Sequence, residues 1–154
     1  MKVLVQRVLN ASLRIEGELI SEIDKGYLLF VGFEEGDDLS LLSKMALKIA
    51  KSRLFEDENG KTNLSIKDVS GSILSVSQFT LAANMKEGNR PSFTKAMRPD
   101  KAKFFYNLWN ENLRSFEIPV KEGVFGSDMK INLCNDGPFT IIFDSKELFG
   151  EKKE

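Results

Sequence analysis

An uninterrupted run of apolar side chains from Tyr27 to Val31 sets the strongest constraint on how this chain folds. A strand with one face in water alternates apolar and polar residues, whereas a strand covered on both faces is apolar throughout. The run is therefore predicted to be a central strand of a sheet that is covered on both faces. The chain has 154 residues, the usual length of one domain with a sizeable core.

The remaining segments predict a single α+β domain, mostly antiparallel, with two helices. Residues 1–33 are typical of consecutive strands with a turn at Glu16-Gly17, and apolar residues at helical spacing predict one helix after Asp38 and another that begins at Pro99. Further strands are predicted around Leu64 and Ile66 and over 72–81, 128–134 and 139–143, and a loop is predicted over 84–98. The domain covers residues 1–144, and residues 145–154 form a charged, frayed tail.

Composition excludes several kinds of chemistry. The chain has no histidine, which excludes Ser-His and Cys-His dyads and imidazole metal ligands, and its one cysteine, Cys134, excludes disulfides and thiolate zinc sites. No glycine-rich phosphate loop is present. The sequence therefore predicts neither a metal nor a cofactor.

The N-terminus carries no secretory signal, because Gln6 and Arg7 interrupt its apolar run, and no apolar run approaches the ~20 residues that span a bilayer. We expect a cytoplasmic protein that does not bind membranes. The formal charge of −1 argues against a non-specific nucleic-acid coat and leaves room for a locally basic docking face.

Two hydroxyls and an amide close the predicted strand 72–81, in the segment Ser77 to Thr80. Such residues line a polar pocket or simply face water. Thr80 is a poor nucleophile, because the sequence offers no evident base to activate its hydroxyl. A backbone-amide oxyanion hole needs no particular side chain, so an enzyme built here would depend on positioning and electrostatics.

The segment Asn135-Asp136-Gly137-Pro138 joins the last two predicted strands. It is either a hairpin turn or a loop that presents bare backbone carbonyls to a ligand. An X-Pro linkage is the only one in which a cis peptide bond costs little, so an unusual carbonyl orientation is accessible here.

Residues 86–103 hold six basic side chains against two acidic ones. This excess is either a solvated surface or a phosphate-binding surface, for which Lys86, Arg90 and Lys95 are the candidates. Phe93 lies within the loop and either stacks on a base or anchors the loop.

Together, SQFTL (77–81) and NDGPFT (135–140) resemble the two signature motifs of the D-aminoacyl-tRNA deacylases, the D-Tyr-tRNA deacylase family. The similarity extends through MKVLVQRV at the start, KGYLLFVGF, FEDENGKTNLS, GNRPSF and FGSDM, and so covers nearly the whole chain.

This resemblance implies a barrel-like homodimer with two sites at the subunit interface. It implies an enzyme that cleaves the ester between a D-amino acid, or glycine, and the 3′-terminal ribose of tRNA. Ser77, Gln78, Phe79 and Thr80 would form the catalytic floor, with backbone amides near Phe79 and Thr80 acting on the substrate and the 2′-hydroxyl of the tRNA assisting.

The resemblance also implies a filter for chirality. A cis Gly137-Pro138 would reach into the partner's pocket within a motif that includes Asn135, and Arg7 would hold the motif in place. Phe125 and Met129 would line the site of the terminal adenosine. Two alternatives remain open: an L-alanyl-tRNA editing enzyme of the same fold with a trans Gly-Pro, and a non-catalytic nucleic-acid-binding module.

Overall fold

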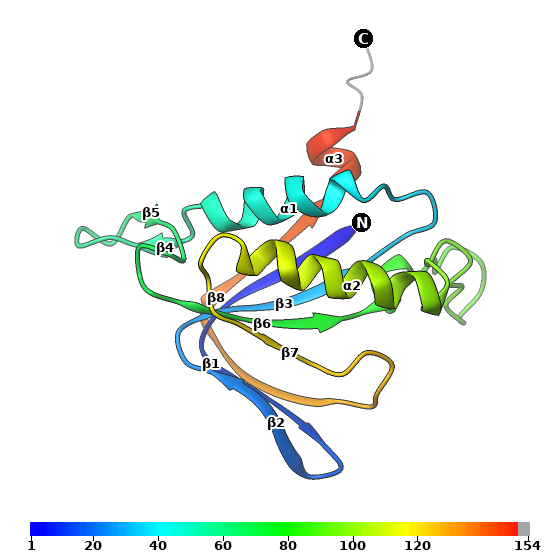
Figure 1. Ribbon diagram of the computed structural model, residues 1–154, viewed down its shortest axis with the longest axis horizontal. Coiled ribbons are helices and arrows are strands. Elements are labelled where there is room, and N and C mark those ends of the chain that lie inside the picture. Colours follow the sequence, from blue (N-terminus) through cyan, green and yellow to red (C-terminus); the bar gives the residue numbers. More distant parts are fainter. Residues whose placement is uncertain (151–154) are drawn as a thin grey trace.

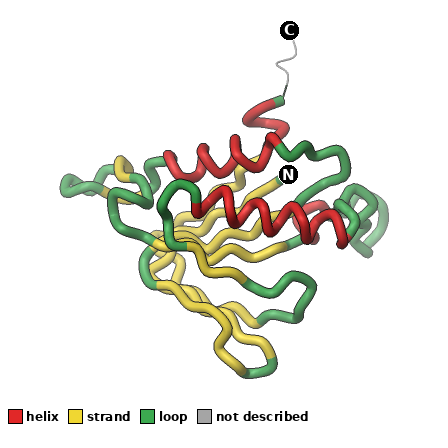
Figure 2. The backbone as a smooth tube through the Cα atoms, viewed as in Figure 1, coloured by secondary structure: helices red, strands yellow, loops and turns green. Residues whose placement is uncertain are grey.

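The computed structural model describes residues 1–150 and is built around one curled, mixed sheet (Figures 1 and 2). Its strands lie in the order β2-β1-β3-β6-β7, and β8 pairs with the other edge of β1. Their bounds are β1 Lys2–Ile15, β2 Glu18–Ile23, β3 Gly26–Gly32, β6 Ser72–Ser77, β7 Val120–Glu122 and β8 Lys130–Asp144. A small hairpin of β4 (Phe55–Glu56) and β5 (Thr62–Leu64) lies apart from it.

The curl of the sheet follows from how β1 changes partners along its length. Its first half pairs with β3 and its second half with β2, while β8 runs along both halves. All three pairings are antiparallel, whereas β3 pairs with β6 and β6 with β7 in parallel. The barrel-like shape is as expected, and most pairings are antiparallel as predicted, but the parallel pairings of β6 with β3 and β7 make the sheet mixed.

Helices α1 (Ser40–Lys51) and α2 (Pro99–Arg114) cover one face of the sheet, as Figure 2 shows. The prediction that the run 27–31 is covered on both faces is confirmed. Tyr27, Leu29 and Val31 belong to the core under the helices, whereas Leu28 belongs to a second cluster within the curled sheet. Both predicted helices are present, and Pro99 stands at the start of α2 as predicted. No helix within residues 1–150 is long and apolar enough to cross a membrane.

The strand predicted over 72–81 is shorter than expected. It ends at Ser77, and residues Phe79–Ala82 form a 3₁₀ helix, η1. The apolar residues of this segment alternate through the junction, so the period alone did not reveal the change. Strand β7, with only three residues, was not predicted.

The C-terminal tail is also more ordered than predicted, because Ser145–Phe149 form a third helix, α3. Ser145 is buried; its Oγ accepts a hydrogen bond from the Met1 ammonium at 2.9 Å, and its backbone N–H donates to Met1 O at 3.0 Å. The Asp144 carboxylate accepts from the backbone N–H of Lys146 and so caps the helix. The rest of the predicted tail, residues 151–154, lies outside the described residues.

Candidate active site

The chain leaves the sheet where β6 ends, and the polar motif spans this exit. Ser77 pairs with Val31 of β3, and the backbone N–H of Gln78 then donates to Val31 O at 2.7 Å before the chain enters η1. Ser77 and Gln78 are half-buried, whereas Phe79 and Thr80 are exposed. The motif therefore lies on an accessible turn that a buried strand holds in place.

A cavity of about 610 Å³ opens beside this turn. Its walls come from β3, the end of β6, the segment 93–102, the loop 125–129 and the start of β8. Five of the predicted site residues line it: Ser77, Gln78, Phe79, Phe125 and Met129. Phe93 lines it too, and its ring meets that of Phe79 edge to face, with centroids 5.0 Å apart.

The turn offers hydrogen-bond donors and no evident base. The side-chain amide of Gln78 donates from Nε2 to Thr80 Oγ1 at 2.6 Å. An amide does not take up a proton at neutral pH, so this contact does not activate the threonine hydroxyl. The first bond of the η1 turn runs from Leu81 N to Gln78 O, and the N–H groups of Phe79 and Thr80 precede it. Such leading amides lack a partner within their own helix and suit a developing oxyanion.

One of our two interpretations made the segment Asn135 to Pro138 a hairpin turn. The structure shows that it is not one. The two strands predicted around it are one strand, β8, and both halves pair with β1. Gln6 pairs with Thr140 and Val8 with Asn135, so Arg7 alone faces residues 136–139, which bulge out of the ladder. The hairpin interpretation failed because it required the flanking strands to pair with each other.

Asn135 closes the base of this bulge. Its Oδ1 accepts from the backbone N–H of Phe139 at 2.9 Å, and its Nδ2 donates to Thr140 Oγ1 at 2.9 Å. The Gly137–Pro138 bond is cis, and both residues are exposed. Gly137 and Pro138 therefore form the exposed tip of the bulge.

Arg7 lies beneath the bulge and is only 5% exposed. Its Nε donates to Asp136 O at 3.0 Å, its Nη1 donates to Leu54 O at 2.8 Å, and its guanidinium carbon lies 4.6 Å from the centroid of the Phe139 ring. A planar fork of donors fits these partners, and the ammonium group of lysine does not.

Within the chain the bulge and the cavity lie apart. Arg7 pairs with Tyr27, and Ser77 pairs with Val31, four residues further along β3. That offset is ~13 Å along the strands. Ile131, where β8 lines the cavity, lies four residues before Asn135, which is likewise ~13 Å along its strand. The structure brings Arg7, Asn135, Gly137 and Pro138 together, and it separates them from Ser77, Phe125 and Met129.

Residues 4–144 match the family model described as D-Tyr-tRNA(Tyr) deacylase. The chain belongs to this family. It is 56% identical to a D-aminoacyl-tRNA deacylase of Lactobacillus gasseri and 57% identical to one of Lactobacillus acidophilus, each over 94% of this chain and 99% of the relative. The expected family and enzyme class, a hydrolase, are confirmed.

Two solved structures share the fold of this deacylase-family member. One is described as a c-Myc DNA unwinding element binding protein, with a TM-score of 0.88 and 42% identity over 94% of this chain and 99% of that one. The other is described as a probable eukaryotic D-amino acid tRNA deacylase, with a TM-score of 0.80 over 92% of this chain and 97% of that one. At 16% identity, the second supports the fold alone.

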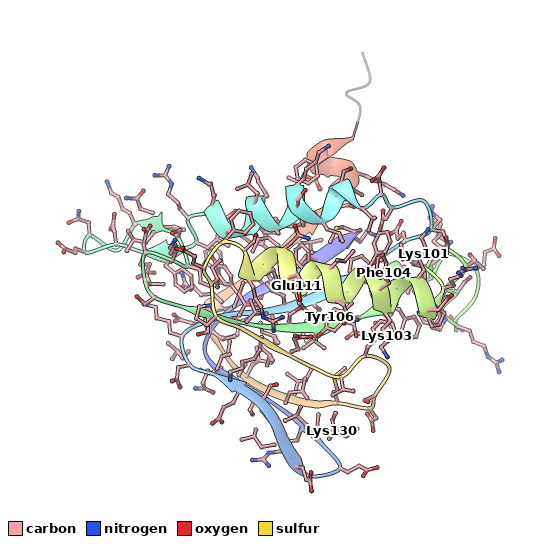
Figure 3. All side chains as sticks on the ribbon, viewed as in Figure 1. Lys101, Lys103, Phe104, Tyr106, Glu111 and Lys130 are labelled. Carbon is pink, nitrogen blue, oxygen red and sulfur yellow. The ribbon has the colours of Figure 1, made fainter. Side chains whose placement is uncertain are left out.

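Sequence reasoning missed one residue that supports the site of this family member. Tyr106 lies between α2 and the sheet (Figure 3), and its hydroxyl donates to Ser75 O at 2.7 Å, two residues before the motif. Its ring lies 6.1 Å from that of Phe125, which lines the cavity. Burial raises the pKa of the Tyr106 hydroxyl, which stays protonated as a donor. The apolar stripe of α2 gave no signal for this role, because the partner lies in a distant strand.

Proposed function

We propose that this protein hydrolyses the ester that joins a D-amino acid, or glycine, to the 3′-terminal ribose of tRNA. One observation carries the proposal: Ser77, Gln78 and Phe79, at the start of the η1 turn, line a cavity whose other walls are mostly apolar. The family membership points to the same reaction, since the matched relatives are D-aminoacyl-tRNA deacylases.

In the proposed reaction, water adds to the ester carbonyl and the bond from that carbon to the ribose oxygen breaks. The amides of Phe79 and Thr80 stabilise the negative charge on the carbonyl oxygen. The neighbouring ribose 2′-hydroxyl assists the proton transfer from water to the departing ribose oxygen. Ser77 and Gln78 shape the floor, and no protein nucleophile is acylated. No metal and no cofactor takes part.

Chirality is set in the proposed homodimer by the bulge of one subunit, which enters the cavity of the other. The separation of bulge and cavity within one protomer supports this arrangement. The carbonyls around Gly137 and Pro138 would collide with an L side chain and leave room for a hydrogen atom, so D-aminoacyl and glycyl esters fit. Arg7 and Asn135 hold the bulge rigid.

Phe125 and Met129 receive the terminal adenosine, and Lys86, Arg90 and Lys95 meet tRNA phosphates. Lys86 and Lys95 line a second cavity, which supports their assignment. Arg90 is exposed and lines neither cavity, so its assignment depends on charge alone. The reaction belongs to the cytoplasm, where tRNA is charged.

The test incubates the purified protein with D-tyrosyl-, L-tyrosyl-, glycyl- and L-alanyl-tRNA and follows release of the amino acid. We expect fast release from the D-tyrosyl and glycyl esters and none above background from the L-tyrosyl ester. Preferential release of L-alanine from L-alanyl-tRNA would instead support the L-specific editing enzyme.

A second candidate function is nucleic-acid binding without hydrolysis. It is favoured by the 42% identical structure that is described as a DNA unwinding element binding protein. The same assay separates the two candidates, because a binding module would release no amino acid from any ester while retaining its affinity for nucleic acid.

A further inference from the structure

We infer that a lysine-lined groove beside the catalytic cavity binds the phosphates of the unpaired 3′ end of the tRNA; this inference rests on the proposed function. The groove has a volume of about 490 Å³. Four lysines line it: Lys2, Lys86, Lys95 and Lys146. We call it the lysine groove.

The tertiary fold assembles the lysine groove from three distant segments. Lys2 begins β1, Lys86 and Lys95 lie in the loop 84–98, and Lys146 lies on α3. A pair of backbone hydrogen bonds between Asn84 and Ser92, 2.8 and 2.9 Å long, closes part of that loop. The groove is thus a built feature of the fold, and Lys2 and Lys146 were not apparent as partners in the sequence.

Glu34 organises one side of the groove and is 8% exposed. Its Oε2 lies 3.2 Å from the Lys146 ammonium, and its Oε1 lies 3.8 Å from that of Lys2. The hydrogen bond from Lys146 to Glu34 raises the pKa of that lysine, so its charge persists across the physiological range. Glu34 therefore holds two ammonium groups at the groove.

The other two lysines supply unmatched charge. Within residues 1–150, no carboxylate lies within 4.0 Å of Lys86 or Lys95. Glu34 and Asp144 are the acidic residues among the lining, and four lysines outnumber them. The groove therefore carries a positive excess in a chain whose formal charge is −1, which favours an anionic ligand.

The groove and the catalytic cavity are immediate neighbours. Phe33 lines the cavity and Glu34 the groove; Ala96 lines the cavity and Lys95 the groove. Helix η1 separates the two, with Phe79 on the cavity and Ala82 on the groove. Consecutive Cα atoms are ~3.8 Å apart, so the two sites meet within one residue.

This adjacency identifies the ligand as RNA. In the proposed reaction the terminal nucleotide occupies the cavity, and the nucleotides before it are covalently attached and carry one phosphate each. A strand that leaves the cavity over η1 enters the lysine groove directly. Lysine ammonium groups bind such phosphates without regard to base sequence.

The test compares two substrates, D-tyrosyl-tRNA and the D-tyrosyl ester of adenosine, which has no phosphate. For K86Q/K95Q we expect kcat/KM on the tRNA to fall about tenfold at low salt. The slope of log kcat/KM against log salt concentration should flatten by about 0.7 for each phosphate that the variant no longer neutralises. K146Q removes one of the two ammonium groups beside Glu34 and keeps that of Lys2, so it should flatten this slope by the equivalent of one phosphate. K146R keeps the positive charge and should have the slope of the wild type. Hydrolysis of the adenosine ester should be unchanged in all variants.

K51Q is the matched control, because Lys51 lines a different cavity. A salt slope on tRNA that is the same in K86Q/K95Q as in the wild type would overturn the inference, as would an equal decrease on the tRNA and the adenosine ester. If the wild type hydrolyses neither ester, the proposed function fails instead. The groove can then still be tested with an RNA hairpin that carries a single-stranded 3′ end and no amino acid. Equal affinity of the wild type and the variants for this RNA would overturn the inference.

Discussion

Arg7 faces Asp136 across the β1–β8 ladder and donates from Nε to the backbone oxygen of Asp136 at 3.0 Å. The same guanidinium donates to Leu54 O at 2.8 Å, so one buried side chain joins the bulge to the chain before β4. A bulge of four residues opposite one would otherwise leave its carbonyls without a fixed direction. The finding explains why an arginine is buried at this position of a strand.

Arg7→Lys should loosen the bulge, because a single ammonium group does not reproduce both hydrogen bonds and the contact with Phe139. We expect a loss of about 1–3 kcal/mol in the free energy of unfolding, measured with denaturant, and a smaller ratio of D-ester to L-ester hydrolysis. Arg53→Lys is the control, since the side chain of exposed Arg53 makes one hydrogen bond among residues 1–150, to the Asn63 side chain. A discrimination ratio equal to that of the wild type would contradict the role of Arg7.

Gly137→Ala should abolish most D-ester hydrolysis. A Cβ built at Gly137 would lie 3.1 Å from Phe139 N and 3.2 Å from Arg7 Nη2, and its φ of +138° disfavours an L residue. Gly60→Ala is the matched control, because Gly60 also has a positive φ but a Cβ there meets nothing within 4 Å. Steady-state rates on D-tyrosyl-tRNA check the prediction, and a full rate for Gly137→Ala would contradict it.

Thr80→Ala should retain hydrolysis within about tenfold of the wild type, equivalent to ~1.4 kcal/mol in the barrier. Among residues 1–150 the Thr80 hydroxyl makes a hydrogen bond with the Gln78 amide and with no base, so its removal takes away that hydrogen bond and leaves the backbone amides in place. Single-turnover kinetics provide the measurement. Accumulation of an acyl-enzyme in the wild type, or a rate close to the uncatalysed one in the variant, would show that Thr80 is a nucleophile.

The two fully buried tyrosines should respond oppositely to removal of their hydroxyls. Among residues 1–150, the Tyr27 hydroxyl has no hydrogen-bond partner, whereas that of Tyr106 donates to Ser75 O. Tyr27→Phe should therefore leave the protein as stable or stabilise it by up to ~1 kcal/mol, and Tyr106→Phe should destabilise it by about 1–2 kcal/mol. Urea denaturation at pH 7 measures both, and a common sign would contradict the assignment.

The stability of the protein should fall above pH ~10. Burial raises the pKa of both Tyr27 and Tyr106, so the folded protein retains protons that the unfolded chain releases. Stability is therefore full below the pKa of unfolded tyrosine and declines as the pH rises above it. Denaturation curves at pH 9 to 11 should show a shallower decline for each Tyr→Phe variant, and a decline identical to that of the wild type would contradict this origin.

The local pattern of apolar residues was sufficient to predict the strands and helices in which that pattern repeats over several residues. The apolar run 27–31 indicated a strand covered on both faces, and helical spacing with Pro99 at the start indicated α2. Strand β7 and the end of β6 were not predicted correctly, because three residues carry no measurable period and a 3₁₀ turn can continue the apolar alternation of a strand.

The sequence by itself determined the central strand, the two long helices, the lack of histidine chemistry and the motifs of the site, because each depends only on residue type and local spacing. The tertiary structure decided that residues 135–138 form a bulge, that this bulge lies far from the cavity, and that Lys2 and Lys146 join Lys86 and Lys95. A Gly-Pro segment gives the same local signal in a hairpin and in a bulge. The difference lies in which strand its neighbours pair with, and that is set by contacts between residues more than a hundred positions apart.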